Sequence, residues 1–236
     1  MFNPNGPTFR EQVRQALSST QRGYDLLAPK FEFTPYRTPD WMLDSVAKIL
    51  SRSEPFDSAL DVCCGTGAGM RMLRPLAQER VVGIDFSEGM LAEGQQLLGD
   101  SAGDAELEFV HGDALGMSFE SQFDVATCFG ALGHIVGKNT EPFLQRVRAA
   151  LKPGGRFIFI SGYRPSAFSL AFWFSHGFNL AMRIRNLLVR PKFIMFYLTF
   201  LLPKIQRTLE ANGFRVEVEA PEELGRYRIV VATRVD

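Results

Sequence analysis

Apolar residues along the chain gather in short runs that alternate with segments of helical spacing. The runs predict strands, and they lie at 59–62, 81–84, 107–110 and 123–129. The last run is apolar enough to be buried on both faces of a sheet. Between the runs, helical spacing predicts one helix over about 70–78 and another from Ser87, its expected N-cap, to Leu98. This alternation predicts an α/β protein.

Both ends of the chain add further elements. Residues 8–28 read as one helix that Pro29 ends, and 41–50 as a second helix with Thr38 or Asp40 as its N-cap. The later elements are a helix at 141–151, a tight turn at 152–155, a strand at 156–161 and a tail from 211 that ends in a strand-like YRIVVATR.

The stretch from Ser58 to Asp85 reads as strand, glycine-rich turn, helix and strand. Such a βαβ unit lets backbone N–H groups at the turn approach a ligand, with a helix N-terminus behind them. Asp85 lies 20 residues after Gly65, where an acid at the end of the second strand can accept hydrogen bonds from ribose hydroxyls. We therefore predict an adenosine-type ligand at this turn.

The residues of the turn narrow the choice of ligand. A dinucleotide fingerprint needs a third glycine that permits close packing of helix on strand, and Met70 stands at that position. Asp61, just ahead of the turn, is unfavourable beside a pyrophosphate but suits the cationic amino-acid end of S-adenosylmethionine. A unit that binds NAD, or no nucleotide at all, is the alternative at this point.

Five motifs in order resemble the class I S-adenosylmethionine-dependent methyltransferases. They are LDVCCGTG, VVGIDFSEGML, FVHGDAL, FDVATCFGALGHI and LKPGGRFIF, within about 58–161. The resemblance is greatest to small-molecule enzymes of the ubiquinone/menaquinone C-methyltransferase group, although Cys63 replaces a glycine usual in the wider class. It implies one Rossmann-like domain with a seven-stranded, mostly parallel sheet of order 3-2-1-4-5-7-6, helices on both faces and a helical lid.

The resemblance also implies a set of residues that bind S-adenosylmethionine and its product S-adenosylhomocysteine. Asp113 would accept from the adenine amino group, and the Ala114 N–H would donate to a ring nitrogen. Phe86 and Met90 supply the flat or soft apolar contacts that a purine needs, whereas His111 is expected to be structural. The full set is Tyr24, Asp61, Cys63, Gly65, Thr66, Gly67, Asp85, Phe86, Met90, Asp113, Ala114 and Phe129.

His134 is the candidate catalytic residue. The loop Gly130–His134 follows the strand at 123–129, and ligand sites in α/β sheets lie at the carboxyl ends of strands. An imidazole there has a suitable pKa for removing a proton at neutral pH, and the alternative is that His134 caps or packs the next helix. The loop lacks an Asn/Asp-Pro-Pro-Tyr sequence, which argues against methylation of adenine N6 or of glutamine.

Composition excludes several classes of function. The chain has 26 basic and 26 acidic residues, so no global field favours nucleic acid. Its three cysteines give neither a disulfide framework nor metal-ligand spacing. The first residues show no basic start followed by an apolar core, so we expect a cytoplasmic protein, with peripheral attachment to a membrane as a further option.

Charge and aromatic content single out the segment 163–207. No Asp or Glu occurs from 142 to 209, a span that holds eleven basic residues, and ten aromatics lie within 163–207. Its apolar runs, 167–182 and 193–202, are too short for a transmembrane hairpin. The segment therefore reads as a lid over an apolar substrate, as a peripheral membrane contact through 167–202, or as a helical hairpin packed on the sheet or buried in a homodimer.

The predicted organisation is a single methyltransferase domain. Its parts are N-terminal lid helices at 1–50, a cofactor-binding core at 56–161, the lid insertion at 163–207 and a C-terminal part at 208–236. The expected reaction methylates a small apolar or aromatic acceptor, such as a quinone precursor or a phenol. Candidate substrate contacts are Tyr36, Phe172, Trp173 and His176. The rival functions are a peripheral membrane lipid methyltransferase and a non-catalytic protein that binds S-adenosylmethionine.

Overall fold

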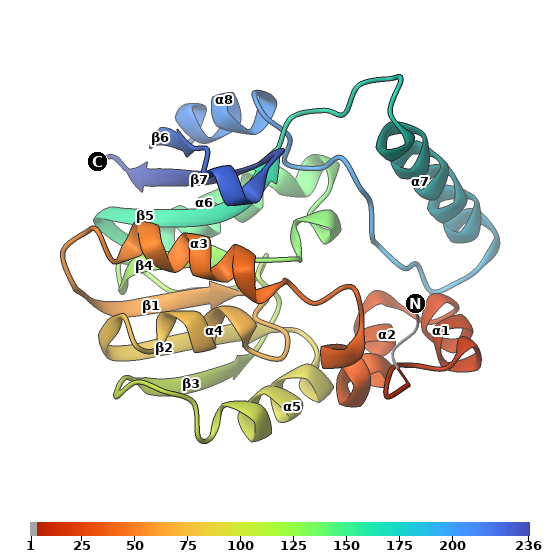
Figure 1. The fold of residues 1–236 in the computed structure, drawn as a ribbon, viewed down its shortest axis with the longest axis horizontal. Helices are drawn as coiled ribbons and strands as arrows, with labels where there is room; N and C mark the ends of the chain where they lie inside the picture. Colours follow the sequence, from red (N-terminus) through yellow and green to blue (C-terminus); the bar gives the residue numbers. More distant parts are fainter. Residues whose placement is uncertain (1–3) are drawn as a thin grey trace.

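A seven-stranded sheet of order β3-β2-β1-β4-β5-β7-β6 forms the centre of the computed structural model, which describes residues 4–236 (Figure 1). Strands β1 to β5 pair in parallel, and β7 runs antiparallel to both β5 and β6. This order confirms the predicted Rossmann-like sheet. The strands are β1 (Phe56–Val62), β2 (Ala77–Asp85), β3 (Glu106–His111), β4 (Phe123–Cys128), β5 (Leu151–Gly162), β6 (Phe214–Glu219) and β7 (Tyr227–Arg234).

Helices cover both faces of the sheet. Side chains of α6 and α8 pack on one face, and those of α3, α4 and α5 pack on the other. The helices are α1 (Phe9–Ala16), α2 (Thr20–Leu27), α3 (Asp40–Leu50), α4 (Ala68–Leu73), α5 (Glu88–Leu98), α6 (Thr140–Ala150), α7 (Leu170–Leu188) and α8 (Lys204–Ala211). The strands are apolar in sequence because both of their faces are buried.

The predicted helix over 8–28 is in fact two helices. Ser19 breaks it, because its hydroxyl accepts a hydrogen bond from the Arg22 N–H (3.2 Å) and so begins α2 as an N-cap. Thr8 caps α1 in the same way, within a capping box that Glu11 completes. The bend lets α2 turn toward the sheet while α1 stays at the surface.

Other predicted boundaries were also wrong. Helix α4 ends at Leu73, and β2 already begins at Ala77, several residues before its apolar run. The N-cap position of α3 is Pro39, which forms no side-chain cap, and Asp40 instead pairs with Arg37. The stretch 152–155, predicted as a tight turn, belongs to β5, where the pairing with β4 is irregular.

The segment after β5 contains a single long helix followed by extended chain. Helix α7 takes up the first apolar run and most of the basic stretch, and the second apolar run continues without a helix to α8. In Figure 1, α7 stands beside α1 and α2 at the side of the molecule where the parallel strands end. Over residues 4–236, no helix combines the length and the apolar character needed to cross a membrane.

Candidate functional site: the glycine turn and its roof

The turn after β1 uses the left-handed backbone conformation at three positions. Cys63, Gly65 and Gly67 have φ angles of 57°, 55° and 85°. For a residue with a side chain this conformation costs about 1–2 kcal/mol, which gives a physical reason why glycine suits the position of Cys63. No atom lies within 4 Å of the place where a Cβ would stand on Gly65, so this edge of the turn is open to a ligand.

Helix α4 packs closely on β2 although it lacks the third glycine of a dinucleotide fingerprint. The missing space is provided by the strand, because a Cβ on Gly83 would lie 2.2 Å from the Met70 sulfur. Met70 is fully buried over this glycine, beside Cys64. The contact is therefore built with the glycine on the strand and the large side chain on the helix.

Asp61 is buried beneath the turn. Its Oδ1 accepts a hydrogen bond from the Thr127 hydroxyl (2.8 Å), and its carboxylate fills the space where a Cβ on Gly69 would stand. Burial, with a smaller effect from the charge of Asp85, raises the pKa of Asp61 to about 7. Asp61 thus braces the start of α4, and a positive group nearby would favour its ionised form.

Asp85 ends β2 with both carboxylate oxygens facing backbone donors. One oxygen accepts from the Gly65 N–H and the other from the Ser87 N–H, each at 2.9 Å. Burial nevertheless raises the pKa of Asp85 above its ordinary value. A carboxylate oxygen can accept more than one hydrogen bond, so this geometry leaves Asp85 able to accept from hydroxyl groups as well.

The predicted adenine contacts lie next to Asp85. Gly112 donates to the Asp85 carbonyl (2.9 Å), which brings the start of the following loop, Asp113 and Ala114, beside the end of β2. Met90 is buried and Phe86 half-buried. The exposed Asp113 accepts from the Leu115 N–H (2.9 Å).

Two segments that are distant in sequence cover the turn and the neighbouring His134 loop, and we call 20–37 and 193–199 together the roof. Asp25 Oδ1 accepts from the Ser87 hydroxyl (2.6 Å) and from the Gly89 N–H (3.2 Å). Glu32 Oε1 accepts from the Thr66 hydroxyl (2.7 Å). Sequence reasoning missed both acids as site residues, and the Tyr-Asp dipeptide at 24–25 was the available signal for Asp25.

The roof lies directly on the turn. A hollow of about 60 Å³ beside it is lined by Glu32, Thr66, Ala68, Arg71, Leu97 and Leu98. Pockets for small molecules usually measure about 300–1,000 Å³. This hollow alone is too small for a nucleoside, and Glu32, which accepts a hydrogen bond from Thr66, forms one of its walls.

Tyr24 of the roof and His134 form a hydrogen-bonded pair. The Tyr24 hydroxyl lies 2.8 Å from His134 Nε2, and His134 Nδ1 is bonded to the Ile194 carbonyl. Because a carbonyl only accepts, Nδ1 carries the proton and Nε2 accepts from Tyr24. Burial lowers the pKa of His134 and raises that of Tyr24, so both are neutral near pH 7.

The surroundings of this pair are aromatic. The Tyr24 ring lies within 6.5 Å of the rings of Phe31, Phe86 and Phe193, measured between centroids. His134 ends a short 3₁₀ turn after β4, and the backbone of this loop pairs with the roof through Phe196 N–H to the Gly133 carbonyl (2.9 Å). The site therefore offers a neutral base in an apolar setting.

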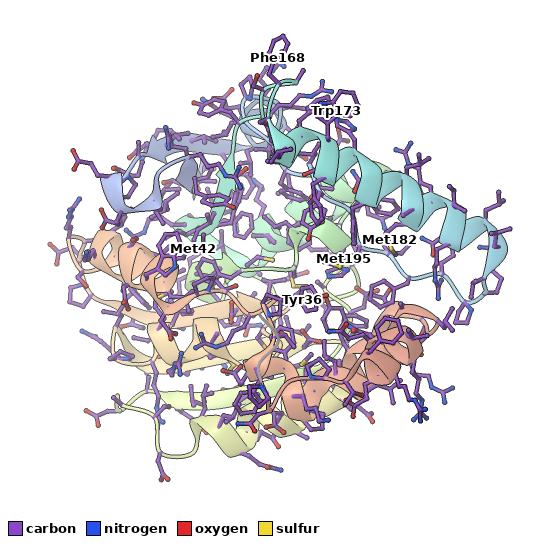
Figure 2. The ribbon with its side chains drawn as sticks, turned by 45° about the vertical axis from the view of Figure 1, so that its right-hand side comes forward. Tyr36, Met42, Phe168, Trp173, Met182 and Met195 are labelled. Atoms are coloured by element: carbon purple, nitrogen blue, oxygen red, sulfur yellow. The ribbon has the colours of Figure 1, made fainter. Side chains whose placement is uncertain are left out.

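The remaining predicted residues lie around this centre. Phe129 is half-buried at the end of β4, and Tyr36 is 43 % exposed on the roof. Phe172 and His176 are in contact on α7, with ring centroids 4.2 Å apart. Trp173 is 66 % exposed, and Figure 2 shows it projecting away from the sheet at the outer end of α7. We therefore do not retain Trp173 as a substrate contact.

These residues fit an adenosyl ligand with a cationic end. They combine two buried acids, backbone donors at an open glycine turn, and apolar side walls. A family profile described as "Methyltransferase domain" matches residues 59–155 of this chain. The matched span includes the turn, Asp85 and His134.

Curated relatives of the chain are demethylmenaquinone methyltransferases. The Bacillus subtilis protein is 29 % identical over 161 residues, which cover 67 % of this chain and 66 % of the relative. The Oceanobacillus iheyensis protein is 26 % identical over 186 residues, covering 78 % and 75 %. The chain thus spans about two thirds to three quarters of the length of these relatives.

Solved structures share the fold at low sequence identity. The DhpI–SAH complex superposes with a TM-score of 0.68 at 19 % identity, covering 97 % of this chain and 99 % of DhpI. An O-methyltransferase family protein from Burkholderia thailandensis gives 0.69 at 17 %, covering 98 % and 68 %. The motif order, the profile match and the curated relatives support a class I S-adenosylmethionine-dependent methyltransferase that resembles the menaquinone group, and the strand order agrees with that fold.

Proposed function

We propose that this protein transfers a methyl group from S-adenosylmethionine to a small apolar or aromatic acceptor, such as a phenol or a quinone precursor. The observation that carries the proposal is the Tyr24–His134 pair in its aromatic surroundings. The names of the relatives support a quinone-type acceptor. An acceptor of this kind becomes a stronger nucleophile when its hydroxyl loses a proton.

The proposed part of the protein in the chemistry is to hold the reactants and move one proton. S-Adenosylmethionine supplies, when bound, an electrophilic methyl group on a sulfonium. The glycine turn and Asp85 would hold the adenosyl part, and Asp61 would face its positive end. The acceptor hydroxyl would give its proton to Tyr24 Oη while Tyr24 gives its own proton to His134 Nε2. The Ile194 carbonyl would stabilise the resulting imidazolium through Nδ1.

A methyl-transfer assay with labelled S-adenosylmethionine tests the proposal. The acceptors are a naphthoquinol with a free ring position, a simple phenol, and phosphatidylethanolamine vesicles. We expect label in the naphthoquinol or the phenol, and His134→Asn should lower kcat/KM by about 10²–10⁴-fold, as for loss of a general base. The variant should still bind S-adenosylhomocysteine in calorimetry, and His111→Asn, at an exposed histidine, is the matched control.

Three outcomes separate the competing functions. Binding of S-adenosylhomocysteine without methylation of any of the three acceptors would reject the acceptor class and favour a non-catalytic binding protein. Label found only in the vesicles would favour a lipid methyltransferase. A folded wild-type protein that binds neither S-adenosylmethionine nor S-adenosylhomocysteine would reject the methyl-transfer proposal itself, and Asp85→Ala shows whether measured binding uses this site.

A further inference from the structure

The side of helix α7 that faces the protein is mixed, because half-buried Phe172, Phe178 and Met182 lie on it beside polar residues. Its buried residues are Ser175 and Asn186. Asn186 donates to the Phe193 carbonyl and accepts from the Phe193 N–H, each at 2.8 Å, and Asn179 makes the same pair of bonds with Tyr197 at 2.9 and 2.8 Å. The two amides thus attach α7 to the roof by polar contacts, and Phe178, whose ring centroid lies 4.8 Å from that of Tyr197, adds an aromatic one.

The opposite side of α7 is apolar and exposed along its whole length. Its large side chains recur at spacings of three, four or seven residues, which places them on one side of the helix. Their exposed fractions lie between 49 % and 90 %. These residues, which we call the α7 apolar face, are Leu170, Trp173, Leu180, Ile184 and Leu187.

Helix α1 adds a second exposed apolar stripe next to the end of α7. Phe9, Val13 and Leu17, four residues apart, are 40–78 % exposed. The Arg185 side chain joins the two helices, because it donates to the carbonyls of Ala16 and Ser18 (2.8 Å each). An exposed apolar face such as that of α7 marks a contact with a partner or a membrane.

Charge decides between the two kinds of contact. Arg183, Arg190 and Lys192 are exposed at the end of α7, and the acid-free span 142–209 includes the whole helix. A second copy of this chain would bring the same cations against them, which is unfavourable at close range. An anionic lipid surface is complementary in both respects, since its head groups attract the cations while its acyl region accepts the apolar face.

We propose that α7 docks on an anionic lipid bilayer and lies parallel to the membrane plane. Its 19 residues span about 28 Å, and the apolar stripe runs along one side only, so the helix suits the interface and not a span. Trp173 and Phe168, which project outward in Figure 2, would enter the boundary between head groups and acyl chains. The inference does not depend on methyl transfer.

The two tryptophans of the chain provide the test. Trp41→Phe leaves Trp173 on the α7 apolar face as the single reporter, and Trp173→Phe leaves Trp41 on α3 as the matched control. With phosphatidylglycerol vesicles we expect a blue shift of Trp173 emission, co-sedimentation of the protein, and weaker binding at high salt. Trp41 emission should not change, and phosphatidylcholine vesicles should bind less protein.

A substitution on the α7 apolar face shows how strongly vesicle binding should depend on that face. Leu187→Glu should weaken vesicle partitioning by about tenfold or more, the equivalent of losing burial of one leucine. Because Leu187 is 77 % exposed, thermal unfolding should be unaffected. Absence of both the shift and co-sedimentation would overturn the proposal. A Trp173 shift that depends on protein concentration without lipid would overturn it in favour of a second copy.

Discussion

Replacing Asp61 with asparagine tests whether burial keeps this acid protonated. Asp61 is 2 % exposed, and its pKa lies near 7 compared with an ordinary 3.8. Asparagine keeps the shape of the side chain and can still bond to the Thr127 hydroxyl. At pH values between these two pKa values, Asp61 keeps its proton in the folded protein and has lost it in the unfolded chain. The free energy of unfolding of the wild type should therefore fall as the pH rises through this window.

The magnitude follows from the two pKa values. Their difference corresponds to about 4 kcal/mol of unfolding free energy. The stability of Asp61→Asn, relative to that of the wild type, should therefore rise by about this amount from about pH 4 to about pH 8. This change with pH is expected in the difference between the unfolding free energies of the two proteins, because the contributions of the other titrating groups cancel in that difference.

Urea unfolding followed by far-UV circular dichroism at several pH values measures the difference. Asp57→Asn, at an exposed acid of the same strand, is the matched control and should show no comparable slope. A difference between wild type and Asp61→Asn that stays constant with pH would refute the reasoning. Adding S-adenosylhomocysteine should reduce the slope if its ammonium group lies near Asp61, because the ligand then favours the ionised acid.

Three further predictions concern packing and the roof. Gly83→Ala should cost about 1–3 kcal/mol of stability, because its Cβ would collide with the Met70 sulfur, and Met70→Ala should recover part of the loss in a double-mutant cycle by urea unfolding. Asn186→Ala leaves the Phe193 N–H and carbonyl unpaired; it should cost about 1–3 kcal/mol and speed amide exchange at 193–197. Ser19→Ala should cost about 1 kcal/mol in thermal unfolding through loss of the α2 cap, and an unchanged midpoint would contradict that role.

Sequence reasoning predicted the order of the sheet better than the limits of its strands. The apolar runs mark only the parts of the strands that helices cover. The first residues of β2, Ala77 to Arg80, pair with β1 at the margin of the core, where polar side chains are tolerated. The dinucleotide fingerprint places its third glycine on the helix, whereas in this protein Gly83 on β2 provides the space beside Met70.

Proximity within one short stretch of the candidate site follows from the sequence, whereas the contact between Tyr24 and His134, which were named as separate candidates, does not. The turn and Asp85 lie within one βαβ unit, so their proximity follows from the chain itself. Tyr24 and His134 are 110 residues apart, and no periodicity links them. For α7, the sequence showed which residues are apolar but not which side of the helix would face the protein, because that depends on the two asparagines meeting the backbone at 193–197.

The two segments of the roof also hold each other. The Thr20 hydroxyl accepts from the Ile194 N–H (2.7 Å), and the rings of Tyr24 and Phe193 stack. One segment lies on the glycine turn and the other on the His134 loop, so a displacement of one segment is expected to move the other. Exchange of the methyl donor and exchange of the acceptor are therefore expected to share a single opening event, and the rate of that event sets an upper limit on turnover.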